Sequence, residues 1–350
     1  MACPILIILC RFLEKFWITM MTTNKVFAVL TALSRSDRRR LVKFMASPYF
    51  NQRKPLTQLC DFFLEKIEAG ETEFDRQMAF NSMFPESNFE DTNFRKYCSD
   101  LLGLVEDFLA VEQFMQKKIN RKLMTIEAVK DRRIVSMYSS SLRDGKNELN
   151  HIKEQSSDYF FQRYLLEKGH YELMELENKG LERFNVEEIF GNLDKFYFIE
   201  KIKYFTSVQS QKNILNLDYK IDFIFPIIEY LLKTQIVDSP VLKIYFESYL
   251  TISDPYDENH YFTLKELLIK YSSLLDNKEA AKLFDSAMNY CTWKINQGKQ
   301  IFNQEYFDLA EKGLNDGILF DNGELNHWKF NNIVANALRL SKVDWVFKFI

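Results

Sequence analysis

Apolar residues recur every three or four positions along most of the chain, which is the spacing of one face of an α-helix. The clearest run is TNFRKYCSDLLGLVEDFLAVEQFM at 92–115, where one apolar stripe extends over the whole segment. The stripe consists of Phe94, Tyr97, Cys98, Leu101, Leu102, Val105, Phe108, Leu109 and Met115. Shorter patterns predict helices over about 55–69 and 73–83, so the N-terminal part is predicted to be a compact helical domain.

One irregular stretch, SPYFNQRKP at 47–55, interrupts these helices. Pro48 disfavours helical backbone at Ser47, Pro55 restarts the pattern, and Asn51 tolerates the unusual backbone angles that a corner needs. We expect a corner between two helices, with the two aromatic side chains packed back between them. The alternative is a partner-binding site, formed by Tyr49, Phe50, Arg53 and Lys54.

After about residue 150 the pattern changes to paired helices joined by short turns. The turns are predicted at Gly169-His170, at Asp276-Asn277 and at Ser341-Lys342. Two segments between them, NLDKFYFIEKIKYF and FPIIEYLLK, are apolar almost all round, which predicts helices that have neighbours on two sides.

Two of these turns carry a resemblance to known proteins. YLLEKGHYELM and ALRLSKVDWVFKFI resemble the turn between the two helices of a tetratricopeptide-type repeat. FMASPYFNQRKPL, FRKYCSDLLGLVEDFLAVE and NLDKFYFIEKIKY together resemble a family of uncharacterised bacterial all-helical proteins, over most of residues 22–350. The resemblance implies no activity, but it implies a longer chain, and Phe349-Ile350 lies on an apolar helix face without a polar terminal helix. We therefore expect a truncated C-terminus.

Composition supports the same fold class. The 350 residues include only 10 Gly and 7 Pro, fewer than a β-rich or doubly wound fold needs for its turns, and 47% are hydrophobic. The predicted fold is all-α, with a helical N-terminal domain at 22–150 followed by a tetratricopeptide-like array of antiparallel helix pairs at 151–350. The net charge is +4 over residues 1–150 and −7 over residues 151–350, which supports a boundary near 150.

The first 21 residues, MACPILIILCRFLEKFWITMM, contain an apolar run from Cys3 to Cys10. No basic residue precedes this run, no small-residue cleavage site follows it, and it is too short to span a bilayer. We prefer to interpret 1–21 as an extension before a natural start at Met20 or Met21; the alternative is a segment with a membrane or export role. The five cysteines are scattered without a CxxC pair, which is typical of a reducing cytoplasm.

Basic residues suggest a possible contact with nucleic acid. Arg38, Arg39, Arg40 and Lys43 lie on one short predicted helix, and Lys117, Lys118, Arg121 and Lys122 lie on a later one. If the two faces met, they would form a surface that neutralises phosphates. However, the chain is acidic overall, with a net charge of −3, and the connection at 47–55 is too long for a helix-turn-helix. Nucleic-acid binding is therefore the less favoured alternative.

Catalytic motifs are missing from the sequence: it contains no GxGxxG, GxxxxGK[ST], GxSxG or HExxH. Asp254, Asp257, Glu258 and His260 come within seven positions of one another, and such groups can bind a divalent ion. Acidic residues just before a helix also cap its free N–H groups, and we favour that interpretation. Turn chemistry similarly accounts for Asp316, Asp321 and Glu324. We expect no catalytic residue, no cofactor and no metal.

Stacked helix pairs form a concave groove suited to a peptide or a partner helix. The leading hypothesis is therefore a non-catalytic scaffold that binds a partner protein or peptide, without a membrane. The sequence identifies neither the partner nor the residues of the groove. The alternative hypothesis is a regulator whose basic N-terminal domain contacts nucleic acid.

Overall fold

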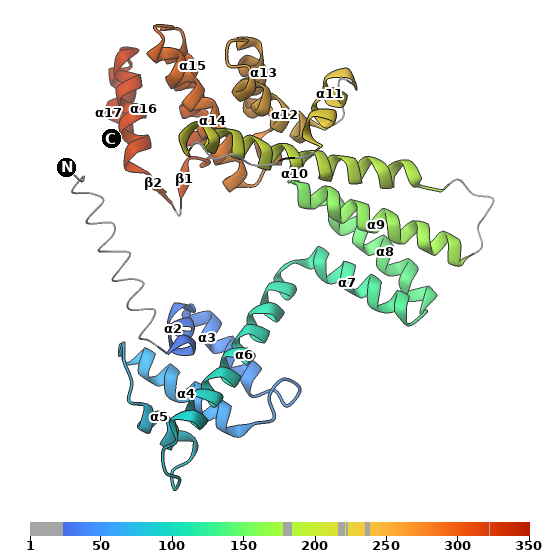
Figure 1. The fold of residues 1–350 in the computed structure, drawn as a ribbon, viewed down its shortest axis with the longest axis vertical. Coiled ribbons are helices and arrows are strands. Elements are labelled where there is room, and N and C mark those ends of the chain that lie inside the picture. The colour runs from blue at the N-terminus through green and yellow to red at the C-terminus, as the bar shows by residue number, and fades with distance from the viewer. Residues whose placement is uncertain (1–23, 178–183, 216–220, 222, 235–238, 322) are drawn as a thin grey trace. The chain divides into compact units, whose positions relative to one another are not determined.

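The computed structural model describes residues 24–177, 184–215, 221, 223–234, 239–321 and 323–350. These residues form sixteen α-helices, one 3-10 helix and one two-stranded hairpin (Figure 1). The prediction of an all-α fold is confirmed. The predicted extension over 1–21 lies outside the described residues. The described chain divides between Lys118 and Ile119 into two compact units, and each unit is described by itself.

Unit 1 is a bundle of five helices. They are α2 (Lys25–Ala32), α3 (Arg35–Met45), α4 (Lys54–Glu68), α5 (Arg76–Met83) and α6 (Asp91–Gln116). The long helix α6 packs against α2, α3 and α4, and α5 packs against α4. Phe27, Phe63, Phe94 and Phe108 are fully buried in the core of unit 1. The apolar stripe predicted over 92–115 is buried or half-buried from Phe94 to Phe108, whereas Leu109 (40% exposed) and Met115 (53% exposed) are not covered.

Local signals in the sequence account for the helix ends of unit 1. Ser34 accepts a hydrogen bond from the backbone N–H of Asp37, whose carboxylate accepts one in return, and this capping box begins α3. Gly70 follows the helix predicted over about 55–69, and it has a φ of +77° just after α4. A residue without a Cβ adopts this left-handed backbone at little cost.

Unit 2 contains the other helices and the hairpin. They are α7 (Lys118–Asp131), α8 (Val135–Asn150), α9 (Ser157–Leu176), α10 (Val186–Leu215), α11 (Ile224–Thr234), α12 (Pro240–Ser253), α13 (Glu258–Tyr271), η1 (Ser272–Leu274), α14 (Asn277–Asn296), α15 (Phe302–Asn315), β1 (Phe320–Asp321), β2 (Glu324–Leu325), α16 (His327–Arg339) and α17 (Val343–Phe349). Although α7 begins at Lys118, its buried side chains all belong to the core of unit 2. The two short strands pair antiparallel, Phe320 opposite Leu325 and Asp321 opposite Glu324. The sequence predicted turn chemistry in this region but not a strand pair.

Helices of unit 2 pack mainly on their neighbours in the sequence. α8 packs on α9, α9 on α10, α12 on α13, α14 on α15, and α15 on α16. Second neighbours also meet, because α12 contacts α14 and α13 contacts α15. The long helix α10 also packs against α12, and the two lie next to each other in Figure 1.

The two segments that are apolar all round behave differently. α10 packs against α9 and against α12, which confirms the prediction of neighbours on two sides. α11 packs against α10, but Phe225, Tyr230 and Leu232 on this helix remain exposed. The prediction of two neighbours is therefore not met for α11 among the described residues.

The turn predicted at Gly169-His170 is wrong, because α9 continues without a break from Ser157 to Leu176. Gly169 instead permits a close approach of α8. A Cβ at this position would lie 3.0 Å from Leu142 Cδ2, and the hydroxyl of Tyr138 donates a hydrogen bond of 2.8 Å to the Gly169 carbonyl oxygen. The small residue therefore serves helix packing, and YLLEKGHYELM does not form the repeat-type turn that it resembles.

The other two predicted turns are present. Asp276 caps α14, and its Oδ1 accepts hydrogen bonds from the N–H groups of Lys278 at 2.8 Å and Glu279 at 2.9 Å. Ser341, with a φ of +57°, separates α16 from α17. Turns are therefore predicted correctly where a cap or a left-handed residue ends the helix, and wrongly where glycine serves packing.

The division between the units differs from the predicted boundary near residue 150. Side chains of α7 and α8 belong to the core of unit 2, among them Ile119, Ile126, Tyr138 and Leu142. The charge change that suggested residue 150 falls instead between α8 and α9. In the part of the chain that the structure describes, helices are either too short or too polar to cross a membrane.

Candidate functional site

The SPYFN stretch forms a corner between α3 and α4. The Asn51 amide donates hydrogen bonds to the Met45 carbonyl oxygen at 3.1 Å and to Thr57 Oγ1 at 3.0 Å. Phe50 stacks on Phe44, with ring centroids 4.1 Å apart. Tyr49 is 88% exposed, so the expectation that both aromatic side chains pack back between the helices is correct for Phe50 and wrong for Tyr49.

The two basic residues after this corner have different environments. The Arg53 guanidinium bonds to the Asp100 carboxylate at 2.5 Å and lies over the ring of Tyr97, 5.0 Å from its centroid. The hydrogen bond with Asp100 raises the pKa of Arg53 above its ordinary value. Lys54 is exposed at the first position of α4. Arg53 therefore acts as a link within unit 1.

Arg53 also borders a polar hollow of about 550 Å³ in unit 1. Its walls are formed by Arg53, Phe80, Phe84, Ser87, Asn88, Glu90, Asn93, Lys96 and Tyr97. Because Arg53 already pairs with Asp100, and Asn93 donates to Glu90 at 2.5 Å, several of its polar groups are satisfied within the protein. These polar groups are therefore not available to a ligand, which makes this hollow a weak candidate site.

Several basic residues of the nucleic-acid hypothesis form contacts within the protein. Arg38 donates to the carbonyl oxygens of Leu30 at 3.1 Å and Thr31 at 2.9 Å, which closes the end of α2. Arg40 pairs with Glu112 at 2.6 Å and also with Asp37.

On α7, Lys122 pairs with Asp144 at 3.0 Å, and Arg121 is half-buried. Lys118 is exposed at the start of the same helix. Arg39, Lys43 and Lys117 are exposed. Lys117, at the end of α6, and Lys118 fall in unit 1 with the basic residues of α3, whereas Arg121 and Lys122 fall in unit 2. Contacts within the protein already use part of the charge of both groups.

The acidic cluster at 254–260 mainly organises the start of α13. Asp257 is its N-cap, and Asp257 Oδ1 accepts a hydrogen bond from the backbone N–H of Asn259 at 3.0 Å, as the cap interpretation predicts. His260 Nδ1 lies 3.0 Å from Glu247 Oε2. Among the described residues, His, Cys, Asp and Glu side chains form no group of three that could hold a metal ion.

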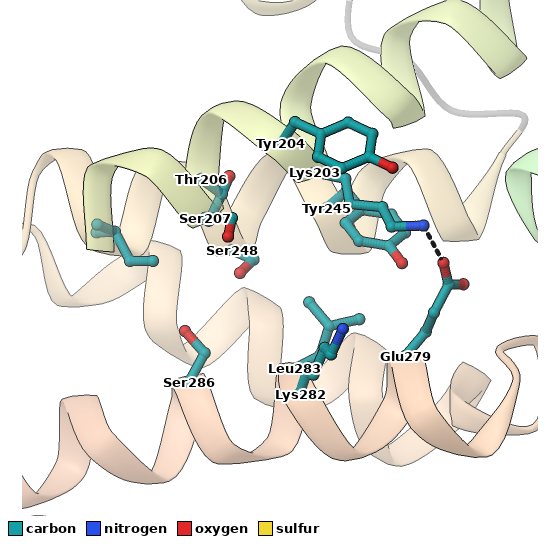
Figure 2. Close-up of a pocket in the computed structure, with 11 residues that line it drawn as sticks. Lys203, Tyr204, Thr206, Ser207, Tyr245, Ser248, Glu279, Lys282, Leu283 and Ser286 are labelled. Carbon is teal, nitrogen blue, oxygen red and sulfur yellow. Dashed lines mark hydrogen bonds and ion pairs between the residues drawn. The ribbon is translucent and has the colours of Figure 1, made fainter. Parts of the chain in front are cut away.

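The stronger candidate site is an open hollow of about 300 Å³ between α10, α12 and α14 in unit 2 (Figure 2). It is lined by Lys203, Tyr204, Thr206 and Ser207 of α10, by Tyr245, Ser248 and Ile252 of α12, and by Glu279, Lys282, Leu283 and Ser286 of α14. Three helices that are far apart in the sequence thus contribute aromatic, aliphatic, hydroxyl and charged groups to one place.

An ion pair crosses this hollow and fixes the charge of two of its groups. Lys203 Nζ lies 2.5 Å from Glu279 Oε1 and 3.4 Å from Glu200 Oε1. Burial lowers the pKa of Lys203, but the hydrogen bond and the negative charge of Glu279 outweigh it, so the pKa is raised. Lys203 therefore stays protonated and paired.

Tyr245 borders the same ion pair. Burial raises the pKa of this phenol well above its ordinary value, and the neighbouring carboxylate of Glu279 adds to the effect. The hydroxyl therefore keeps its proton at neutral pH and can act as a hydrogen-bond donor. A paired lysine and a protonated phenol are suited to binding rather than to proton transfer or nucleophilic attack.

An adjoining groove extends the site along α10. Tyr204 is 64% exposed and lines both the hollow and this second groove of about 460 Å³. Phe196, Tyr197, Phe205 and Ile221 form most of the apolar wall of the second groove. A ligand larger than one side chain therefore has an aromatic surface next to the hollow.

Sequence reasoning missed every residue of this hollow. The usable signal was the spacing of polar residues within apolar helices, such as Lys203 and Ser207 four positions apart or Tyr245 and Ser248 three positions apart. Such spacing places polar groups on one helix face, but it does not indicate which helices face one another.

The functional assignment therefore depends on the geometry of the hollow itself. The two regions proposed from sequence, the corner at 47–55 and the basic residues of α3 and α7, lie outside this hollow. Comparison of the chain with protein-family models, with curated proteins and with solved structures finds no match, so the resemblance to bacterial all-helical proteins remains a prediction.

Proposed function

We propose that this protein is a non-catalytic scaffold that binds a peptide or an extended segment of a partner protein in the hollow between α10, α12 and α14. The observation that carries the proposal is the convergence of three helices on one open hollow that has mixed polar and aromatic walls. Grooves that bind peptides combine aromatic and aliphatic contact area with a few polar groups that set orientation.

The packing order of unit 2 supports this proposal. From α12 to α17 each helix packs on its sequence neighbour, and α12 and α14 also meet as second neighbours. In helical-repeat proteins this order places alternate helices on one face, where they form an extended binding surface. We propose that α12 to α17 form a tetratricopeptide-like array and that α10 extends its inner face.

The electrostatics of the hollow support a binding role without catalysis. Its ammonium–carboxylate pair, Lys203 with Glu279, neutralises itself, and Tyr245 keeps its proton. The described cysteines Cys60, Cys98 and Cys291 are free and buried, and burial raises the pKa of Cys60 and of Cys291 to about 12, so these thiols are unreactive. Unpaired thiols persist in a reducing cytoplasm, which is the location we propose.

A displayed library of random heptapeptides, selected on the purified full chain, tests this function. Selection is repeated on Ser207→Trp, which places an indole in the hollow from an exposed position of α10 and should leave the melting temperature nearly unchanged. We expect peptides that bind the wild-type chain and fail to bind Ser207→Trp. Peptides that bind both proteins equally would place the binding surface elsewhere and reject the proposed site.

A further inference from the structure

Two lysines line the hollow between α10, α12 and α14, and only one of them is neutralised. Lys203 is paired with Glu279 at 2.5 Å. Lys282 lies on α14, about one turn after Glu279. It is exposed and forms no ion pair in the part of the chain that the structure describes. Glu200, the second partner of Lys203, lines the adjoining groove rather than this hollow. The hollow therefore has one uncompensated positive charge.

A hydroxyl group of an otherwise buried residue lines the same hollow. Ser248 is 2% exposed, and its side chain forms no hydrogen bond with another described residue. In Figure 2 its hydroxyl points into the space between α12 and α14, as do those of Ser207 from α10 and Ser286 from α14. A ligand atom that accepts a hydrogen bond from this hydroxyl gains the net energy of that bond.

The size of the hollow limits what can fill it. A volume of about 300 Å³ is at the lower end for small-molecule sites, and it accommodates one or two side chains of a peptide. A carboxylate has two oxygens that accept about four hydrogen bonds between them, which matches one ammonium group and the nearby hydroxyls. A cationic side chain would face Lys282, and the Glu279 carboxylate is not open to it: Oε1 is bonded to Lys203, and Oε2, which has no hydrogen-bond partner among the described residues, is buried.

We infer that the hollow selects peptides by an acidic side chain, whose carboxylate pairs with Lys282 and accepts hydrogen bonds from Ser248 and Ser286. This inference depends on the proposed function, since it names the class of peptide that the same site takes. The aromatic wall beyond Tyr204 then contacts the apolar neighbours of the acidic residue. Opposite charges at an interface contribute mainly to the choice of partner.

A double-mutant cycle on a peptide from the heptapeptide selection tests the inference. The peptide is synthesised with its Asp or Glu and with the matching Asn or Gln, and both are measured by fluorescence anisotropy against the full chain. Losing one charge-assisted hydrogen bond weakens binding by about tenfold or more, so we expect at least this difference for wild-type protein. Lys282→Glu should abolish the preference, and Ser248→Ala should reduce it.

Lys243→Glu is the matched control, because Lys243 is an exposed lysine of α12 that does not line the hollow. It should leave both affinities unchanged. Selected peptides without an acidic residue, or equal affinities for the acid and amide peptides, would overturn the inference, as would a preference that survives Lys282→Glu. If such peptides still fail to bind Ser207→Trp, the binding function stands and only the acidic specificity is rejected.

Discussion

The hydroxyl of Tyr138 donates a 2.8 Å hydrogen bond to the carbonyl oxygen of Gly169, and this bond joins α8 to the middle of α9. The bond requires the two helix backbones to lie close together. A Cβ on Gly169 would lie 3.0 Å from Leu142 Cδ2 and 3.5 Å from the Tyr138 hydroxyl oxygen. Glycine at this position thus belongs to the core of unit 2 and to a continuous helix.

Replacing this glycine by a branched residue should destabilise unit 2. Gly169→Val adds three carbon atoms to a filled contact, and overpacking of this kind costs roughly 1–3 kcal/mol. Gly191→Val in α10 is the control, because a Cβ there has no neighbour within 4 Å and the helix tolerates valine better than glycine. Urea unfolding measures both variants, and an equal effect of the two substitutions would contradict the packing role of Gly169.

Alanine substitutions of Phe50 and Tyr49, the two aromatic residues of the corner, should differ in their effect on stability. Phe50 stacks on Phe44 and is 38% exposed, so Phe50→Ala should cost about 1–2 kcal/mol, less than the ~3–5 kcal/mol of a fully buried phenylalanine. Tyr49→Ala should change the free energy of unfolding by less than about 0.5 kcal/mol, as is usual for exposed residues. Thermal unfolding of the two single variants is the measurement, and a similar loss for both would show that Tyr49 also supports the corner.

A buried lysine should contribute to the stability of unit 2. Lys294 is 1% exposed, bonds to Glu258 at 2.9 Å, and lies within 6 Å of the ring centroids of Tyr290, Trp293 and Phe302. Lys294→Met keeps the aliphatic stem but removes the charge, and we expect a loss of about 1–3 kcal/mol.

Lys299→Met removes the other, half-exposed partner of Glu258, and this control should cost less than about 1 kcal/mol. Chemical denaturation gives the free energy of unfolding of both variants for this comparison. An effect of Lys299→Met as large as that of Lys294→Met would show that burial of Lys294 adds nothing.

Acidification should weaken the stabilisation that Glu258 provides through its bonds with Lys294 and Lys299. Hydrogen bonds from Lys294 and Lys299 hold the pKa of Glu258 below its ordinary value of 4.5. Because the pKa is lower in the folded state than in the unfolded state, the stabilising contribution is complete above about pH 4.5 and decreases as the pH falls toward the folded-state pKa. Unfolding free energies measured between pH 3 and pH 7 should therefore decrease less steeply for Glu258→Gln than for wild-type protein.

The scaffold hypothesis and the nucleic-acid hypothesis make opposite predictions about DNA binding at low salt. Arg38, Arg40 and Lys122 form contacts within the protein, so we expect no retardation of a 30-base-pair duplex by the full chain in a gel-shift titration at 50 mM salt. Electrostatic binding to DNA is strongest at low ionic strength, which makes this condition the most permissive. A retarded band that disappears as salt is raised, and that Arg39→Glu with Lys43→Glu weakens, would favour the regulator hypothesis.

Most of the helices could be predicted because their apolar spacing and end signals are local. The stripe of 92–115 and the left-handed Gly70 show this for unit 1, and the cap residue Asp276 shows it for unit 2. Gly169 shows the limit of such reasoning. The same glycine is compatible with a turn or with a close contact to Tyr138, and only the position of α8 distinguishes them.

The candidate site could not be predicted for a related reason. Lys203, Ser248 and Lys282 belong to no recognisable sequence motif, and their meeting depends on the packing of α10, α12 and α14 around one hollow. Conspicuous residues were also misleading. The run Arg38, Arg39 and Arg40 suggested a free basic surface, yet two of these three side chains bond within unit 1.

The close contact at Gly169 also restricts how this chain can diverge. A side chain larger than hydrogen at position 169 requires space that must come mainly from position 142, because Leu142 is the nearest neighbour of the missing Cβ, ahead of Tyr138 and Ile126. In homologous chains that lack this glycine, we therefore expect compensating exchanges to smaller residues at position 142, and covariation between these two sites should mark the pairing of α8 with α9.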